Sequence, residues 1–310
     1  EYLEKILELK KILKSKSSAW KASSFLSRTH GQAASPSTFG KEINVFLSRL
    51  DNEIKTLKSI KVKGKWGGAT GNFHTLVLID EKKNWINFIK GFFKFIKTPL
   101  NTLTTQIEPH DCIAELSHSI VRINNVLIDM NRDIWMYISN DLFKLKVIKG
   151  EVGSSTMPHK VNPIDFENSE GNLELSNALF TFFGDKLSKS RLQRDLSDST
   201  VLRNIGVPFG HSYLAIQSLI KGFSKLEVNK EQSLKELNNN WQVLGEAIQT
   251  VMKLEGYDNA YEIIKDLTRG EFLTENSYKS LINSLDISIK SKNKLLKLTP
   301  ATYIGLSKSI

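Results

Sequence analysis

The sequence has little of what a disulfide scaffold or a membrane protein requires. Its 310 residues include one cysteine, Cys112, so no internal disulfide can form and a reducing compartment such as the cytoplasm is favoured. No apolar run approaches the roughly 20 residues that cross a membrane. The longest candidate, residues 85–96, is interrupted by Asn, Lys and Gly. The opening residues, EYLEKILELKKIL, are charged and amphipathic, so we expect no signal peptide in them.

Strand patterns and metal motifs are also scarce. No stretch shows sustained period-two alternation, which predicts few strands. Gln106, Glu108 and His110 have two-residue spacing, but the chain has no CxxC or HExxH pair to complete a zinc site, so we expect no metal. The GGATG run at residues 67–71 superficially resembles a phosphate cradle. It lacks the preceding strand and the GKS/T ending of a P-loop.

The net charge of +10 leaves a nucleic-acid reading open. However, the lysines are spread along many segments and fit solvated helix faces better than one binding stripe. We therefore expect neither a nucleic-acid partner nor a membrane. A basic field would attract a phosphorylated dicarboxylate substrate, and a non-catalytic basic helical scaffold stays an alternative.

Apolar residues recur at helical spacing over most of the chain. The clearest seam contains Ile113, Ile120 and Leu127 and is typical of a long bundle helix. We predict helices over residues 1–16, 39–58, 81–94, 111–130, 132–146, 163–188 and 206–223. Beyond residue 226 the helices become shorter and more polar. The predicted fold class is all-α, with a central long-helix bundle over residues 1–223 and a small helical C-terminal domain over residues 224–310.

The stretch GEVGSSTMPHKVNPIDFENSEG, residues 150–171, combines a Gly/Ser loop with the start of a helix. Asn162 suits the N-cap and Pro163 the first helical position, while Asp165 and Glu167 place carboxylates where the helix dipole favours them. Such a loop beside Lys160 can bind anions and bring a serine to a bound carboxylate. The alternative is an ordinary Ser/Gly loop before a capped helix.

Two further stretches carry polar residues in suggestive patterns. In LSRTHGQAASPSTFGKE, residues 26–42, His30 precedes a glycine in a Ser/Thr-rich turn, which can point its ring into a cleft; the alternative is a loop histidine that caps a helix. In RLQRDLSDSTVLRN, residues 191–204, the spacing of Arg194, Ser199 and Arg203 lets some of them share a helix face. Two guanidiniums and a hydroxyl suit a phosphate, although surface charge paired with neighbouring aspartates fits as well.

Together these stretches resemble one enzyme family. GSSTMPHKVNP is similar to the signature loop of the aspartase/fumarase superfamily, and TMPHKVNPIDFENSEGNLELSNA resembles the bacterial-type branch of the adenylosuccinate lyases. LSRTHGQAASPST is similar to the family pattern TRTHGQPATPST, with departures at Ser27-Arg28 and Ala34-Ser35. RDLSDSTVLRN resembles the phosphate site of this branch. It separates the branch from fumarase and aspartase, whose substrates carry no phosphate.

The resemblance implies a fold, an assembly and a reaction. The fold would be a long-helix bundle that assembles as a cytoplasmic homotetramer, with active sites shared between subunits. The reaction would be β-elimination of fumarate from a phosphorylated succinyl-purine: adenylosuccinate, giving AMP, and the succinyl-carboxamide ribotide of purine biosynthesis. No metal or organic cofactor is expected.

The resemblance also implies roles for individual residues. Ser154 would be the general base and His30 the general acid. Substrate contacts would come from Thr29, Gln106, Lys160, Asn162, Glu167, Arg194, Ser199 and Arg203. Lys160 and Asn162 would hold succinyl carboxylates, Glu167 would support the site, and the last three would clamp the phosphate. Asn72 and His74, beside a GAxGN-like loop, would be neighbours of the substrate.

One departure concerns what the chain lacks. The family's first domain, its second active-site histidine and a TSxDIxN-type loop have no counterpart in the sequence. We therefore expect a shortened form of a longer protein with an incomplete site. Argininosuccinate lyase, fumarase or aspartase chemistry stays open for the same signature loop, and RDLSDSTVLRN argues against it.

Overall fold

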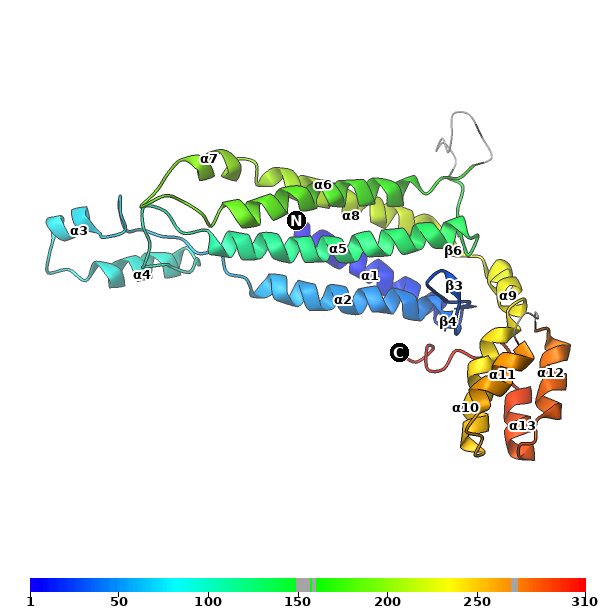
Figure 1. Cartoon of the computed structure of the whole chain (residues 1–310). Helices are drawn as coiled ribbons and strands as arrows, with labels where there is room; N and C mark the ends of the chain where they lie inside the picture. The colour runs from blue at the N-terminus through cyan, green and yellow to red at the C-terminus, as the bar shows by residue number, and fades with distance from the viewer. Residues whose placement is uncertain (149–156, 158–159, 269–272) are drawn as a thin grey trace. The chain divides into compact units, whose positions relative to one another are not determined.

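The computed structural model describes residues 1–148, 157, 160–268 and 273–310, and Figure 1 shows its trace. The chain divides into two compact units. The first unit contains residues 1–9, 48–133 and 164–222, and the second contains residues 10–47, 134–163 and 223–310. The division therefore passes through four helices: α1 (Tyr2–Trp20), α2 (Phe39–Ser59), α5 (Asp111–Ser139) and α8 (Gly206–Lys225).

The first unit is built on long helices that lie side by side (Figure 1). Its part of α5 packs with α6 (Ile164–Lys186) and α8 (Gly206–Lys225). A cluster of buried apolar side chains contains Ile120 of α5, Phe180 and Phe183 of α6, and Leu187 just after the end of α6. Three short helices belong to the same unit: α3 (His74–Ile79), α4 (Trp85–Phe95) and α7 (Ser197–Leu202).

A buried polar layer joins these long helices. The Asn124 amide on α5 donates to the hydroxyls of Ser176 on α6 and Ser212 on α8, at 3.1 and 3.0 Å. The two hydroxyls lie 2.7 Å apart, and Ser176 also donates to the Pro208 carbonyl at 2.9 Å. All three polar side chains are fully buried. Because an unpaired polar group there would be costly, this layer fixes the register of three helices.

The second unit contains three short antiparallel strand pairs. β1 (Ser24–Phe25) pairs with β4 (Ser37–Thr38), and β2 (Arg28–Thr29) pairs with β3 (Gln32–Ala33). β5 (Phe143–Leu145) pairs with β6 (Leu226–Val228). An aromatic cluster lies beside the first and third pairs: the rings of Phe25 and Phe39 stack with centroids 4.2 Å apart, and Tyr137 meets both rings edge-on.

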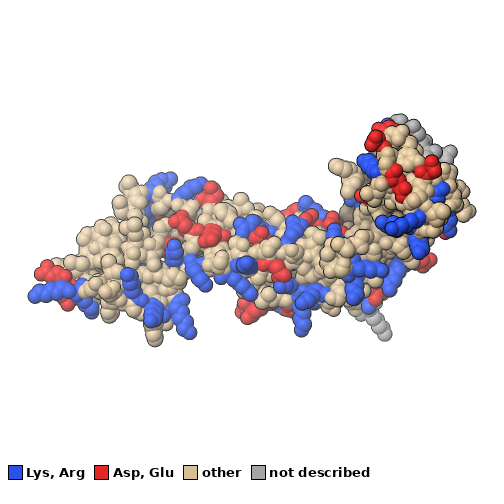
Figure 2. All heavy atoms as spheres, turned by 90° about the horizontal axis from the view of Figure 1, so that it is seen from below, with Lys and Arg blue, Asp and Glu red and all other residues tan. Residues whose placement is uncertain are grey.

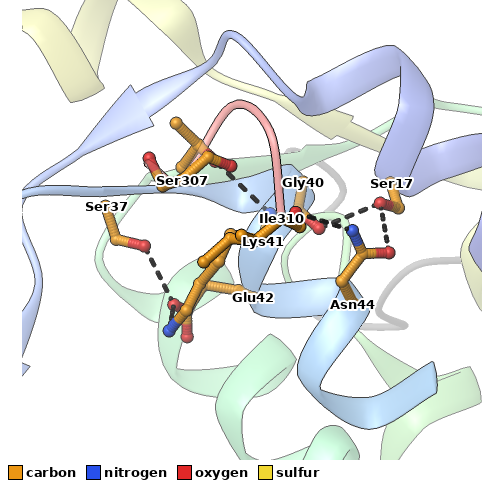
Figure 3. Close-up of polar contacts among 9 residues, drawn as sticks. Ser17, Ser37, Gly40, Lys41, Glu42, Asn44, Ser307 and Ile310 are labelled. Carbon is orange, nitrogen blue, oxygen red and sulfur yellow. Dashed lines mark hydrogen bonds and ion pairs between the residues drawn. The ribbon is translucent and has the colours of Figure 1, made fainter. Parts of the chain in front are cut away.

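The end of the chain packs on the start of α2 within the same unit (Figure 3). The Asn44 amide donates to the Ile310 carbonyl at 3.1 Å, and the Thr38 hydroxyl donates to the Ser307 carbonyl at 3.2 Å. The Ser17 hydroxyl of α1 lies 2.7 Å from the Asn44 side-chain oxygen and 3.0 Å from the Gly40 carbonyl. The last residues therefore form part of the packing around α2.

The C-terminal helices of the second unit have a core of their own. They are α9 (Lys230–Asn238), the 3₁₀ helix η1 (Trp241–Leu244), α10 (Gly245–Leu254), α11 (Ala260–Thr268), α12 (Glu275–Ser284) and α13 (Ile289–Leu296). Thr274 and Ser277 form a capping box at the start of α12. The Tyr278 hydroxyl is buried and donates to the Leu295 carbonyl at 2.9 Å, and burial raises the pKa of Tyr278 to about 12.

The predicted all-α long-helix class is confirmed, with several corrections to the elements. Residues 132–146 were expected to be helical throughout, but α5 ends at Ser139 and residues 143–145 form β5, which pairs with a strand distant in the sequence. Helix α4 begins at Trp85 because Asn84 caps it, not at residue 81. Helix α6 begins at Ile164, one residue after Pro163, and α3 was not predicted. The division at residue 224 into two domains stays a prediction.

The polar layer predicts different costs for two neighbouring asparagines. Asn124→Ala removes the buried amide that donates to both hydroxyls and leaves a space in its place, so the free energy of unfolding should fall by about 1–3 kcal/mol. Asn125→Ala is the matched control because this side chain is exposed and makes one surface hydrogen bond, so it should cost at most about 0.5 kcal/mol. Urea unfolding followed by circular dichroism measures both, and equal costs would contradict the role of the layer.

Candidate active site

The predicted site residues fall into both units. Gln106, Glu167, Arg194, Ser199 and Arg203 belong to the first unit. Thr29, His30, Lys160 and Asn162 belong to the second. Ser154, the predicted base, lies outside the described residues.

His30 lies at the tip of a minimal hairpin. Strands β2 and β3 pair Arg28 with Ala33 and Thr29 with Gln32, which leaves His30 and Gly31 as a two-residue turn. Both turn residues have positive φ, 52° and 73°. A two-residue hairpin of this kind requires left-handed backbone at both positions, which glycine adopts freely and histidine more readily than most residues. The turn leaves the His30 ring exposed.

Gln106 and Arg194 are brought together within the first unit. An Nη1 hydrogen of Arg194 is donated to the Gln106 Oε1 at 3.4 Å, and the Gln106 backbone N–H is donated to the Gln193 carbonyl at 3.2 Å. On its other side, Arg194 Nη2 lies 3.9 Å from Oδ1 of Asp198, whose side chain is 3% exposed. The buried Nε of Arg194 has no hydrogen-bond partner among the described residues. The guanidinium is therefore fixed by a carboxylate and an amide while donors remain for an anion.

Helix α7 carries the rest of the predicted clamp. Asp195 accepts hydrogen bonds from the Ser197 hydroxyl and, at 2.7 Å, from the Ser197 backbone N–H, and both lower the pKa of Asp195. Of the three predicted clamp residues only Ser199 lies inside this helix, because Arg194 precedes it and Arg203 follows its last residue. Arg203 is exposed, and its N–H is donated to the Ser199 carbonyl at 3.4 Å. Ser199 and Arg203 therefore lie one helical turn apart, whereas Arg194 lies outside the helix.

Lys65 links the Gly-rich loop to the Gln106 segment, a role that the sequence did not indicate. Its ammonium group donates hydrogen bonds to the carbonyls of Gly68, Thr105 and Gln106 at 2.7, 3.3 and 2.5 Å. Burial lowers the pKa of Lys65. The nearby chain lines a cavity of about 420 Å³, whose walls come from Leu103, Thr104, Thr105, Ile107, Pro109, Leu187, Ser188, Ser190 and Leu192. Thus one lysine holds two loops in place beside an open cavity.

The described part of the signature segment has its charges near the start of α6. Asp165 is buried and lies 3.6 Å from the Lys221 ammonium on α8, while Glu167 is exposed. Lys160 is exposed, Asn162 is half-buried, and the Lys160 N–H is donated to the Met157 carbonyl at 3.1 Å. Asp165 and Glu167 occupy the first turn of α6 as the sequence predicted.

The alternation of Gln106, Glu108 and His110 has a structural reason. The two carboxylate oxygens of Glu108 accept from the Asn101 amide at 3.0 Å and from the His110 N–H at 2.8 Å. Within the described ranges, no group of three or more His, Cys, Asp or Glu side chains is arranged to hold a metal ion. Glu108 therefore shapes the loop that carries Gln106.

The surface charge is mixed where Figure 2 displays it. Lysine and arginine are interspersed with acidic side chains over the face shown. Among the helices that the structure describes, none has the length and hydropathy that a membrane crossing requires. A nucleic-acid interface gains no support from this view.

Comparisons with known proteins identify the family. The model of a lyase family matches residues 1–175, more than half of the chain, and a model described as the C-terminal part of adenylosuccinate lyase matches residues 190–304. The chain therefore belongs to this lyase family.

The similarity narrows further among curated relatives. The chain is 52% identical to an adenylosuccinate lyase of Legionella pneumophila strain Corby over 282 residues, which are 91% of the chain and 62% of the relative. It is 50% identical to that of Escherichia coli K12 over 280 residues, 90% of the chain and 61% of the relative. The predicted resemblance to adenylosuccinate lyases is confirmed. The chain spans less than two thirds of the length of these relatives.

Solved structures support the fold at lower identity. The 3-carboxy-cis,cis-muconate lactonizing enzyme of Pseudomonas putida superposes with a TM-score of 0.75 at 20% identity, over 99% of this chain and 69% of that one. A fumarate lyase from Mesorhizobium sp. BNC1 superposes with a TM-score of 0.76 at 16% identity, over 99% of this chain and 70% of that one. At these identities the likeness is one of fold alone.

Two glycines in the Lys65 loop provide a test of its packing. Gly68 and Gly71 both have positive φ, 78° and 83°. A side chain at either position should cost about 1–2 kcal/mol through backbone strain. A Cβ at Gly71 would also lie 1.9 Å from the Thr104 carbonyl oxygen, whereas a Cβ at Gly68 meets open space. Gly71→Ala should therefore lower the melting temperature clearly more than Gly68→Ala in differential scanning fluorimetry, and equal shifts would contradict this close approach.

Proposed function

We propose that the protein catalyses β-elimination of fumarate from a phosphorylated succinyl-purine, as an adenylosuccinate lyase. The observation that carries the proposal is the identity of about half of all positions with adenylosuccinate lyases across 90% of the chain. The substrates would be adenylosuccinate, which gives AMP, and the succinyl-carboxamide ribotide of purine biosynthesis. The coarser class, a fumarate-releasing lyase, rests on the family alone.

The reaction needs one base and one acid. A base removes a proton from the succinyl carbon next to a carboxylate, whose oxygens take up the resulting negative charge, and an acid protonates the departing nitrogen. We assign the base to Ser154 and the acid to His30. The exposed position of His30 at a hairpin tip supports this, because a ring there can reach a substrate without displacing packed side chains. The elimination moves protons and an electron pair only, so the proposed mechanism uses no cofactor.

A serine base must be assisted because its hydroxyl pKa is far above neutral. Lys160 and the start of α6 are assigned the role of stabilising the alkoxide and the doubly charged succinyl carboxylate. Lys160 and Asn162 would bind the two succinyl carboxylates, with Thr29 and Gln106 as further contacts and Glu167 as a support.

The phosphate is assigned to Arg194, Ser199 and Arg203. The described geometry supports Arg194 most directly, since Asp198 and Gln106 fix its guanidinium and its Nε has no described partner. An arginine held in this way loses little side-chain entropy when it binds a phosphate. Ser199 and Arg203, within and just after α7, complete the set.

The assembly and the domain organisation belong to the same proposal. We infer a cytoplasmic homotetramer with active sites shared between subunits, a bundle domain over residues 1–223 and a C-terminal domain over residues 224–310. Exposed side chains on the long helices, such as Leu175, Phe182 and Leu214, support association because they would otherwise face water.

The function is tested by fumarate release from adenylosuccinate, followed by ultraviolet absorbance with the natural full-length protein. Ser154→Ala and His30→Ala should each lower kcat by at least about 10²–10⁴, the usual contribution of an acid or base, while substrate still binds. Ser155→Ala is the matched control and should retain activity. Turnover by Ser154→Ala near the wild-type rate would contradict the base assignment, and absence of fumarate from the wild type would contradict the function.

The phosphate assignment predicts a change in binding rather than in chemistry. Arg194→Ala and Arg203→Ala should each raise KM about ten- to a hundredfold with a smaller change in kcat, because a charged hydrogen bond contributes roughly 1.5–3 kcal/mol. Lysine at either position should restore only part of the lost substrate binding, since it keeps the positive charge but lacks the two-pronged guanidinium. Arg191→Ala is the matched control, because this side chain is 83% exposed and pairs with Asp195.

A substrate analogue without the phosphate separates the clamp from general charge. The wild type should bind this analogue weakly, and Arg203→Ala should lose little further affinity for it. Equal losses for phosphorylated and unphosphorylated substrates would instead favour a lyase of the same family whose substrate carries no phosphate.

A further inference from the structure

The hairpin that carries His30 has no buried residue of its own. Each of the four residues in β2 and β3 is exposed, and so are His30 and Gly31. The chain becomes buried again on both sides, at Leu26 and at Pro36. A two-stranded hairpin without apolar burial is marginally stable by itself. The pairing of β1 with β4 and the hydrogen bond from the Ala34 N–H to the Ser27 carbonyl hold the base of the hairpin, so polar side-chain contacts are needed to restrain its outer part.

Two such contacts run from the hairpin to the C-terminal helices of the same unit. On the first strand, Nη1 of Arg28 donates a hydrogen bond to the Gly31 carbonyl at 3.3 Å, across the His30 turn. Nη2 of the same side chain pairs with the Glu236 carboxylate on α9. After the second strand, the Ser35 hydroxyl donates a hydrogen bond to the Glu246 carboxylate on α10 at 2.6 Å. The hairpin is thus held at both of its ends by carboxylates.

The Glu236 anchor is built more firmly than a surface ion pair. The Glu236 side chain is only 14% exposed. The Asn240 side-chain amide donates a hydrogen bond to the Glu236 backbone carbonyl at 2.7 Å, which restrains the end of α9. Below the pair, Leu26 packs with Leu237 and Val243 in a buried apolar cluster. The position of the carboxylate is therefore fixed, and the planar guanidinium of Arg28, which contacts both Glu236 and the Gly31 carbonyl, restrains the His30 turn relative to it.

We propose that Glu236 and Glu246 are positioning residues for His30. They touch no substrate and act through Arg28 and Ser35, so that the C-terminal helices set the direction in which the imidazole presents its proton. The proposal rests on the assignment of His30 as the general acid. It accounts for a catalytic histidine on a hairpin with no core, since a misplaced acid is costly to the rate.

The test uses Glu236→Gln and Glu246→Gln in the full-length protein. Glu231→Gln is the matched control, because this exposed glutamate lies on the same helix α9 and away from the hairpin. Glu236→Gln should lower kcat about tenfold, within the range that a small misplacement causes, with KM changed less than about twofold. The loss should be largest for the substrate whose nitrogen leaves least readily. Glu246→Gln should act in the same direction and more weakly, because its contact is exposed.

A second measurement does not depend on activity. Trypsin cleaves after arginine, so the rate of cleavage between Arg28 and Thr29, measured by mass spectrometry of the folded protein, reports how firmly the Arg28 segment is held. It should rise severalfold in Glu236→Gln and stay unchanged in Glu231→Gln. Arg28→Gln should match Glu236→Gln in kcat, and the double variant should be no worse than either single one.

The outcomes separate this proposal from the proposed function. Faster cleavage together with a lower kcat and an unchanged KM supports it. Unchanged cleavage overturns the anchoring, whatever the activity. Faster cleavage with unchanged kcat overturns the positioning role, while the assignment of His30 as the acid and fumarate release itself would still stand, because His30→Ala tests them separately. Equal losses for all leaving groups would show that Glu236 acts on the general stability of the fold.

Discussion

The register of the long helices is the constraint on which the first unit depends. Apolar seams can slide by a turn with little loss, whereas the Asn124, Ser176 and Ser212 layer pairs its groups in one register only. Helix α6 ends at residue 186, shortly after its buried residues Phe180 and Phe183, and the segment with Arg194 follows. Helix α5 starts just after the Gln106 segment. The meeting of Gln106 and Arg194 therefore follows from how α5 and α6 are aligned.

The arginine at this meeting point is held by a buried carboxylate. Asp198 is almost wholly buried and lies near one side of Arg194 at a distance longer than a hydrogen bond, 3.9 Å. A buried carboxylate without a partner would be costly, so the arginine is required where it lies. Yet the pair is not saturated, since Arg194 Nε and Asp198 Oδ1 have no hydrogen-bond partner among the described residues. In the proposed phosphate site, an anion would accept from the donors of an arginine whose position Asp198 and Gln106 already restrict.

Much of this fold could be predicted from the sequence, because helical periodicity is a local signal. The seam of Ile113, Ile120 and Leu127 predicted α5, and motif resemblance pointed to His30, Gln106 and Arg194. What was missed depends on partners far away in the chain. Strand β5 exists because it pairs with β6, about eighty residues later. Lys65 resembles any surface lysine until the Thr105 and Gln106 carbonyls are placed around it.

The same distinction applies to His30, the proposed acid. A Thr-His-Gly sequence is enough to indicate a turn, since glycine supplies the left-handed conformation that a two-residue hairpin needs. It does not fix the direction in which the turn points, because none of the residues of this hairpin is buried. In our proposal that direction depends on the contact between Arg28 and Glu236, which lie 208 residues apart in the sequence. The local backbone thus determines that the imidazole lies on an exposed tight turn, and in our proposal a helix distant in the sequence determines how that turn is oriented. Under the proposed mechanism, the C-terminal helices would take part in positioning the acid although none of the proposed catalytic residues lies on them.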